Sequence, residues 1–372
     1  MTDTTTPHPN RFSVDELLLD SAENLFASTC SFDAVQAAEE SGWADGVWNA
    51  VAEAGFAWIG LPESAGGSGG SLLDACEVLR IAGAHAAPIP LAETALTGGW
   101  LLAKAGLRLP DGPVSVVPGT SADTLVVTAS DDGGVVLDGS VHRVPWVNKA
   151  DCIAALVSVE GDPEGQQRVL SIRLGQTLVE PFTNMAGEPR ETMHFAATPV
   201  PADHVGIVEG PVADELRLRG ALSRTMMMAG ALEAMSKLTV DYTEQRQQFG
   251  KPVGRFQAVQ QHLVWGAQDA AIAKMTAQVA AARASDDVVA AEFEIAAART
   301  VAEDSASTAT RWAHQAHGAM GMTQEYALHH LSRRLWAWRH EYATPGEWAK
   351  KVGRLAEQGG AEGLYPLIAS QP

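Results

Sequence analysis

Residues 241–261, DYTEQRQQFGKPVGRFQAVQQ, have the residue types and spacing best suited to hold a nucleotide-like ligand. Arg246 and Phe249 end one helical pattern, and Gly250 and Pro252 interrupt it before a second helical pattern begins. A guanidinium makes bidentate contacts to phosphate, and a phenyl ring offers a stacking face. The sequence therefore predicts a corner between two helices that binds phosphate and a ring. A plain turn with a solvated arginine and a core phenylalanine is the alternative.

The composition restricts the classes of partner. The 372 residues are enough for two or three domains, and 46% of them are apolar, so large cores can form. The formal net charge of −19 argues against nucleic acid and anionic membranes, which both attract basic surfaces. The three cysteines, Cys30, Cys76 and Cys152, are far apart and predict neither a disulfide framework nor a zinc site.

The sequence predicts neither a signal peptide nor a transmembrane helix. The N-terminus, MTDTTTPHPN, is polar and lacks the apolar core of a signal peptide. No run of about 18 apolar residues is present, so no transmembrane helix is expected. We therefore expect a cytoplasmic protein.

The residue composition and hydrophobic pattern change twice along the chain. Residues 1–111 contain helical patterns, among them one over 13–27 with Ser13 and Glu16 as a capping box. Residues 112–207 hold short segments rich in Val, Ile and Thr, separated by Gly, Asp and Pro, which predict an antiparallel β-domain. Residues 208–372 hold long Ala-rich helical patterns that predict a four-helix bundle. The expected fold is therefore an α+β multidomain chain with a helical, a β and a second helical domain. Helices are predicted over 31–40, 43–54, 71–84, 90–105, 212–247, 255–284, 288–317 and 323–342.

Several motifs in this order resemble those of the acyl-CoA dehydrogenase family. The segment from Tyr242 to Gln257 is similar to the family pattern YxxxRxQFGxP…FQ, and the segment from Gln315 to Glu325 is similar to QxxGxxGxTxE. Residues 60–69 resemble the LPExxGGxG loop, and residues 146–151 resemble the WITN…AD strand. The resemblance covers essentially the whole chain and includes the heterotetrameric, steroid side-chain type.

The resemblance implies FAD as cofactor, bound at a subunit interface. Arg246, Gln248 and Phe249 are expected to reach the FAD of a neighbouring subunit, with Gln315 and Gly318 lining its phosphates. The same resemblance places Trp146, Asn148 and Thr344 among the flavin contacts, and Arg224 in the helix that flanks the substrate channel.

Two departures from the family pattern concern catalysis. The TEPxxGSD loop is replaced by residues 118–123, PGTSAD, which puts contacts to the chain's own flavin in doubt. The EGT triplet that carries the catalytic glutamate falls on Tyr342, Ala343 and Thr344. The adjacent Glu341 is the candidate base, with Glu347 as a weaker one. The base needs a carboxylate in an apolar pocket, where its pKa rises toward the operating pH.

The resemblance implies three functions in competition. The first is an FAD-dependent acyl-CoA dehydrogenase subunit that introduces an α,β-double bond, with a bulky substrate as one possibility. The second is a non-catalytic partner in an α2β2 enzyme, which completes the flavin site of a related chain. The third is an acyl-CoA oxidase or flavin monooxygenase on the same fold. A homo- or heterotetramer and an electron-transfer flavoprotein as electron acceptor are the implied partners.

Overall fold

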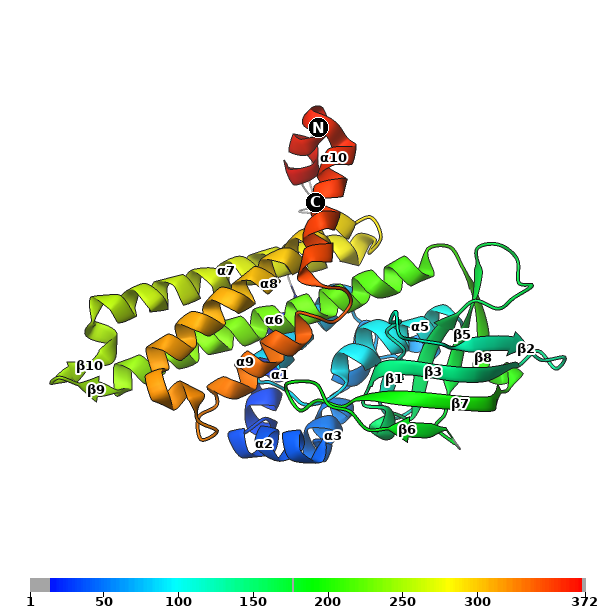
Figure 1. Ribbon diagram of the computed structural model, residues 1–372, viewed down its shortest axis with the longest axis horizontal. Helices are drawn as coiled ribbons and strands as arrows, with labels where there is room; N and C mark the ends of the chain where they lie inside the picture. The colour runs from blue at the N-terminus through cyan, green and yellow to red at the C-terminus, as the bar shows by residue number, and fades with distance from the viewer. Residues whose placement is uncertain (1–13, 176, 370–372) are drawn as a thin grey trace, which may run out of the picture.

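The computed structural model describes residues 14–175 and 177–369. A group of N-terminal helices, a β-rich middle and a bundle of long helices follow one another along the chain (Figure 1). This arrangement confirms the predicted fold class. No helix in the described ranges is both long and apolar enough to cross a membrane.

The N-terminal helices begin close to where their capping residues predict. They are α1 (Glu16–Thr29), α2 (Phe32–Ser41), α3 (Asp45–Glu53) and α4 (Leu72–Ala84). Ser31 caps α2, and Ser71 forms a capping box with Asp74 at the start of α4. The expected cap of α1 is wrong, because the Asp15 carboxylate accepts from the Leu17 amide there, and Ser13 lies outside the described residues.

The next helical segment contains a π-helical turn, η3 (Glu93–Thr97), followed by α5 (Gly98–Lys104). Single π-helical turns inside helices are rare and occur frequently at functional sites. Both Glu93 and Thr97 are buried, and the turn packs against the long helix α6 (Val212–Gln245). The helix predicted over 90–105 is therefore not a regular α-helix, because a π-helical turn occurs where this segment faces the bundle.

The middle part consists of two four-stranded sheets, with strand orders β1-β4-β5-β8 and β2-β3-β7-β6. All pairings are antiparallel except that of β1 with β4, which is parallel and corrects the purely antiparallel expectation. Strands β6 and β8 were not predicted; β6 is only three residues long, and β8 follows a proline-containing turn. The strands are β1 (Val114–Val116), β2 (Val126–Ala129), β3 (Val135–Pro145), β4 (Cys152–Val157), β5 (Gln166–Ile172), β6 (Leu178–Glu180), β7 (Arg190–Val200) and β8 (Val205–Glu209).

The bundle is organised around α6 (Val212–Gln245), whose 34 residues span about 51 Å. The hairpin strands β9 (Gln247–Gln248) and β10 (Lys251–Pro252) connect it to α7 (Gln257–Asp286), which packs against α8 (Glu292–His317). The helix predicted over 323–342 is shorter, α9 (Leu328–Trp338), and a further helix that was not predicted follows, α10 (Pro345–Ala369). The sequence predicted that Trp336, Trp338 and Trp348 pack against the bundle; Trp338 and Trp348 are buried there, whereas Trp336 is 37% exposed.

The N-terminal helices and the bundle share one apolar core. Helix α4 lies so close to α6 that a Cβ atom on Gly230 would lie 1.8 Å from the Arg80 carbonyl oxygen. Only glycine permits this backbone approach. The segments that carry the candidate site residues are therefore held on a common rigid body.

Candidate functional site

A cavity of about 470 Å³ lies where the β-rich part meets α6 and the segment between α9 and α10. Its walls come from regions far apart in the sequence, including the Pro118–Ser121 loop, the end of β3 and the start of β7. Charged side chains are prominent in the lining: Arg143, Arg190, Arg217, Arg224, Glu341 and Glu347. The cavity therefore contains the two residues expected to act on substrate, Arg224 and Glu341.

The Glu341 carboxylate is held by two arginines. Its Oε1 accepts from Arg190 Nε at 2.8 Å, and its Oε2 accepts from Arg224 Nε at 2.5 Å. Arg224 is 1% exposed and also pairs with the buried Glu93 of η3. The neighbouring Arg339 takes no part in these pairs, since its Nη1 donates to Ser307 Oγ at 2.7 Å.

This pairing determines the acidity of Glu341. Burial alone would raise the pKa of the carboxyl, but Arg190 and Arg224 outweigh it and lower the pKa from 4.5 to about 2. A carboxylate of such low pKa is a weak proton acceptor at neutral pH. In this arrangement Glu341 has the opposite of the raised pKa that a base for a weakly acidic α-proton needs.

The ion pairs continue beyond Glu341 across the molecule. Arg190 Nη2 donates to Glu188 at 2.9 Å, and Glu188 lies 3.7 Å from Arg334 Nε of α9. Arg334 Nη1 in turn donates to Glu39 of α2 at 2.6 Å. Charges of alternating sign therefore run from η3 through α6 and β7 to α9 and α2. Such a chain fixes the relative position of the N-terminal helices, the sheet and the bundle.

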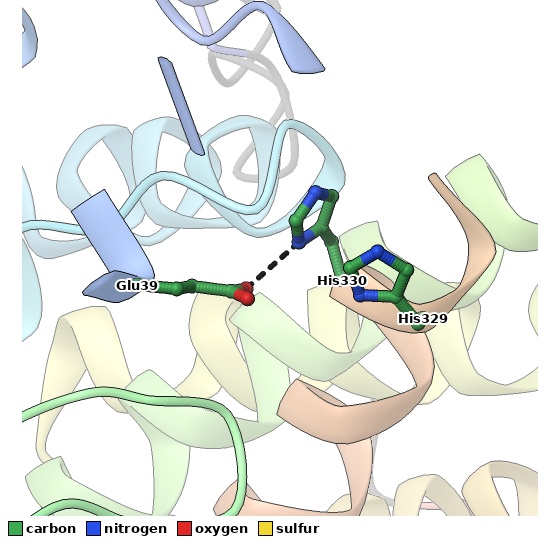
Figure 2. A group of neighbouring side chains, drawn as sticks. All are labelled: Glu39, His329 and His330. Atoms are coloured by element: carbon green, nitrogen blue, oxygen red, sulfur yellow. Dashed lines mark hydrogen bonds and ion pairs between the residues drawn. The ribbon is translucent and has the colours of Figure 1, made fainter. Parts of the chain in front are cut away.

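The α2 end of this chain has the spacing of a metal site. Glu39, His329 and His330 offer ligand atoms that all lie within 4.8 Å of one another (Figure 2). His330 Nδ1 bonds to Glu39 at 2.8 Å, and the Arg333 guanidinium bridges Glu39 and His329 Nδ1. Since a guanidinium already lies between the candidate ligands, we interpret the group as the end of the ion-pair chain.

The backbone around Glu341 is held from α8. Arg299, which is fully buried, donates from Nη2 to the carbonyl oxygens of Trp338 at 2.6 Å and Glu341 at 3.1 Å. Its Nε donates to Glu303 at 2.8 Å. Burial outweighs this ion pair and raises the pKa of Glu303 to about 7. The backbone of the site segment therefore depends on a buried pair whose acid titrates near neutral pH.

A second group of predicted site residues lies at the far end of the bundle, around the β9–β10 hairpin (Figure 1). Phe249 is 90% exposed and has a φ of +52°. Arg246 and Gln248 are exposed as well, and the Arg246 guanidinium makes no ion pair with the described residues. An exposed ring beside an unpaired cation is the combination that a nucleotide would occupy.

Gln315 and Gly318 lie at the same end of the bundle. Tyr242 at the end of α6 stacks on His317 with ring centroids 4.4 Å apart, which joins the α6 and α8 ends. Gly318 has a φ of +60°, and a Cβ atom added to it would have no neighbour within 4 Å. Gln315 is exposed. The open backbone leaves room for close approach of a phosphate, so these residues fit one part of an FAD site.

The remaining predicted flavin contacts, Trp146, Asn148 and Thr344, lie near the cavity, but each already contacts another side chain of the same chain. Trp146 is 2% exposed, and the Arg190 guanidinium covers its ring at 4.8 Å. Asn148 Nδ2 donates to Glu191 at 3.0 Å, and Thr344 donates to Glu347 at the start of α10. No contact in the described part of the chain joins these residues to the hairpin group.

The two groups belong to different places on the molecule. Arg224 and Arg246 are separated by 22 positions along α6 and its cap, or about 33 Å. The residues expected to bind FAD at the hairpin are therefore remote from the cavity that contains Glu341. This separation is consistent with a hairpin that serves another subunit's cofactor.

Sequence reasoning missed Arg190, Glu93 and Arg299 as parts of the site. Arg190 and Glu341 are separated by 151 positions, and Arg224 and Glu93 by 131. A charged residue inside an otherwise apolar segment was the available signal, since such a residue needs a buried partner. The identity of the partner could not be read from the local pattern.

Comparison with known proteins agrees with this arrangement. Residues 14–107 match the model of the acyl-CoA dehydrogenase N-terminal domain, and residues 213–339 match that of the C-terminal domain. The acyl-CoA dehydrogenase IpdE2 of Mycobacterium tuberculosis is 29% identical over 324 residues, which cover 84% of this chain and 88% of the relative. Proteins of this family are FAD-dependent.

Solved structures show the same fold at lower identity. One chain of the ChsE4–ChsE5 complex from Mycobacterium tuberculosis superposes with a TM-score of 0.81 at 22% identity, covering 93% of this chain and 99% of that one. Butyryl-CoA dehydrogenase from Megasphaera elsdenii gives a TM-score of 0.82 at 17% identity, covering 95% and 99%. With both terminal domains matched and the middle sheets between them, the chain belongs to the acyl-CoA dehydrogenase family.

Proposed function

We propose that this chain is a subunit of an FAD-dependent acyl-CoA dehydrogenase and that it completes the flavin site of a neighbouring, related chain without supplying the catalytic base. The observation that carries the proposal is the Glu341 carboxylate, which two arginines hold at a pKa of about 2. The exposed hairpin at the other end of α6 is the part of the chain that serves the neighbour.

The reaction explains why the acidity of Glu341 matters. Introduction of an α,β-double bond requires a base that takes the α-proton of the thioester while hydride leaves the β-carbon. FAD, when bound, supplies the oxidising power that accepts this hydride. The base must have a pKa near the operating pH, which burial provides only where no cation lies beside it. Because Arg190 and Arg224 lie beside Glu341, burial does not raise the pKa of this carboxyl.

At the hairpin, each residue has a role that its geometry allows. Arg246 offers an unpaired guanidinium for the pyrophosphate, and Phe249 offers a ring face for the adenine. Gly318 allows a phosphate to approach its backbone closely. These contacts bind and orient a cofactor that belongs to the neighbouring chain.

The assembly that follows from this role is a heterotetramer of two unlike chains. The ChsE4–ChsE5 complex gives a precedent for two chains on the same fold. The Tcur3481–Tcur3483 steroid acyl-CoA dehydrogenase has the same fold, with a TM-score of 0.79 at 20% identity, and suggests a bulky acyl group as substrate, held mainly by the partner chain. We further propose an electron-transfer flavoprotein as electron acceptor, and the cytoplasm as location.

A second candidate function keeps Glu341 as the base. Its side chain is one-fifth exposed and lines the cavity, so a ligand can reach it. This function requires Arg190 and Arg224 to leave the carboxylate when substrate binds. Reaction with oxygen in place of a protein acceptor would indicate an oxidase or monooxygenase instead.

Purification with and without the partner tests the proposal. The full chain is expressed alone and together with a related acyl-CoA dehydrogenase chain, and the flavin bound per chain is measured by absorbance. We expect a colourless chain alone and a yellow complex whose flavin is bleached anaerobically by an acyl-CoA. A chain that is yellow and bleached by acyl-CoA on its own would contradict the proposal.

A further inference from the structure

Tyr342 lines the cavity and has an unusual backbone conformation. Its φ is +58°, and that of Ala343 is +107°. Two consecutive non-glycine residues in the left-handed region are uncommon, and the surrounding structure must hold them there. The contacts of the Tyr342 ring show what holds this turn.

The ring is fitted against α6 at Gly220. A Cβ atom on Gly220 would lie 2.2 Å from two ring carbons of Tyr342, so only glycine leaves room for the ring. A glycine inside a 34-residue helix is unfavourable unless a packing contact requires it. On the other side, Thr97 of the π-helical turn forms a hydrogen bond with Tyr342. The ring is therefore wedged between α6 and η3.

The ring packs against the apolar core, while the cavity that it lines is charged. Met226 and Met227 of α6 and Leu96 of η3 are buried members of that core. The Arg224 guanidinium lies 5.8 Å from the ring centroid on the cavity side. An acyl chain that extended from the cavity toward these apolar side chains would have to pass through the place that Tyr342 fills.

We propose that Tyr342 is a specificity-determining plug that closes the cavity between α6 and η3, so that the cavity of this chain takes the polar end of an acyl thioester and excludes its acyl chain. The proposal rests on the proposed function in taking an acyl-CoA as ligand. It assigns the acyl group to the cavity of the partner chain.

Removal of the ring tests the plug with p-cresol as probe. Tyr342→Gly takes away a p-cresol-sized group, and glycine suits the positive φ of this position. We expect saturable binding of p-cresol to Tyr342→Gly, seen as a rise in Tm and by calorimetry, and none to the wild type. Tyr342→Phe keeps the ring and is the matched control, which should also bind no p-cresol. A folded Tyr342→Gly variant without p-cresol binding would overturn the proposal.

A chain-length series on the wild type needs no variant and decides the matter if Tyr342→Gly does not fold. Acetyl-, butyryl-, hexanoyl- and octanoyl-CoA are titrated into the full chain purified alone. A plugged cavity gives affinities that differ less than twofold across the series. An open apolar channel would instead raise the affinity about fourfold for each buried methylene, and that result would refute the plug.

These readouts separate the plug from the proposed function. Both are binding measurements, so they are independent of turnover by the chain. A chain that carries its own flavin and oxidises acyl-CoA would contradict the proposed function. The p-cresol and chain-length results would still decide whether Tyr342 closes the cavity.

Discussion

Substitution of Glu341 by glutamine should reveal a structural role for this carboxylate. The folded-state pKa of about 2 lies about 2.5 units below the ordinary value of 4.5. At about 1.4 kcal/mol per pKa unit, the carboxylate contributes about 3 kcal/mol to the free energy of unfolding at neutral pH. Glutamine keeps the shape of the side chain but leaves Arg190 and Arg224 without that charge. Loss of one partner from a buried ion pair typically costs about 3–5 kcal/mol.

The assay is thermal and urea unfolding of the wild type and Glu341→Gln. For 372 residues at about 2.1 cal/mol/K each, the unfolding entropy is about 0.8 kcal/mol/K, so the expected fall in Tm is about 4 °C. Glu357→Gln, on the exposed side of α10, is the matched control and should leave Tm unchanged within about 1 °C.

The pH dependence gives the sign of the effect. Because the folded-state pKa is depressed, the contribution of Glu341 is fully present above pH 4.5 and is lost as the pH falls toward 2. The stability difference between wild type and Glu341→Gln should therefore be constant from pH 5 to 8 and shrink below pH 4.5. Equal stability of the two proteins at pH 7 would refute the assignment of Glu341 to the ion-pair chain.

Other perturbations address the remaining parts of the molecule. Burial raises the folded-state pKa of Glu303 to about 7, so its protonated form stabilises the fold below pH 4.5 and that stability is lost as the pH rises through 7. Glu303→Gln should remove this slope, and its stability relative to the wild type should grow by about 3 kcal/mol from pH 4.5 to 8 in urea unfolding; an unchanged slope would contradict the shift. At the hairpin, Phe249→Ala and Arg246→Gln should weaken flavin retention by the assembled enzyme while Tm of the chain stays within about 1 °C, because both side chains are exposed. Tyr365→Ala, at another exposed aromatic, should leave flavin retention unchanged, and equal loss in all three variants would show that the hairpin has no specific role.

The sequence predicted the elements whose signals are local. Helix α6 was expected over 212–247 and is found at Val212–Gln245, because its apolar and small residues repeat with helical spacing over many turns. The cap at Ser71 was predicted because a hydroxyl satisfies amides only two or three residues away, and Ser31, at the predicted start of α2, caps that helix in the same way. The turn between α6 and α7 was located through Gly250 and Pro252, but its two short strands were not predicted.

The site was harder to predict because its geometry is non-local. That Glu341 lies between Arg190 and Arg224 depends on how the sheet docks on the bundle, and no spacing in the sequence encodes it. The π-helical turn that places Glu93 against Arg224 also interrupts an ordinary helical pattern without a local signal. The sequence shows a tyrosine at position 342, where the family pattern has the catalytic glutamate. The packing of this ring against Gly220 could be recognised only from the structure.

The central claim is that this chain does not supply the base, and one rate tests it most directly. The rate of anaerobic flavin bleaching by an acyl-CoA is measured in the assembled enzyme, with either wild-type chain or Glu341→Gln. Removal of a general base typically costs a factor of about 10²–10⁴. We predict that the bleaching rate per assembled, flavin-loaded enzyme changes less than twofold. A fall of 10² or more in enzyme that still assembles and holds flavin would contradict the claim and identify Glu341 as the base.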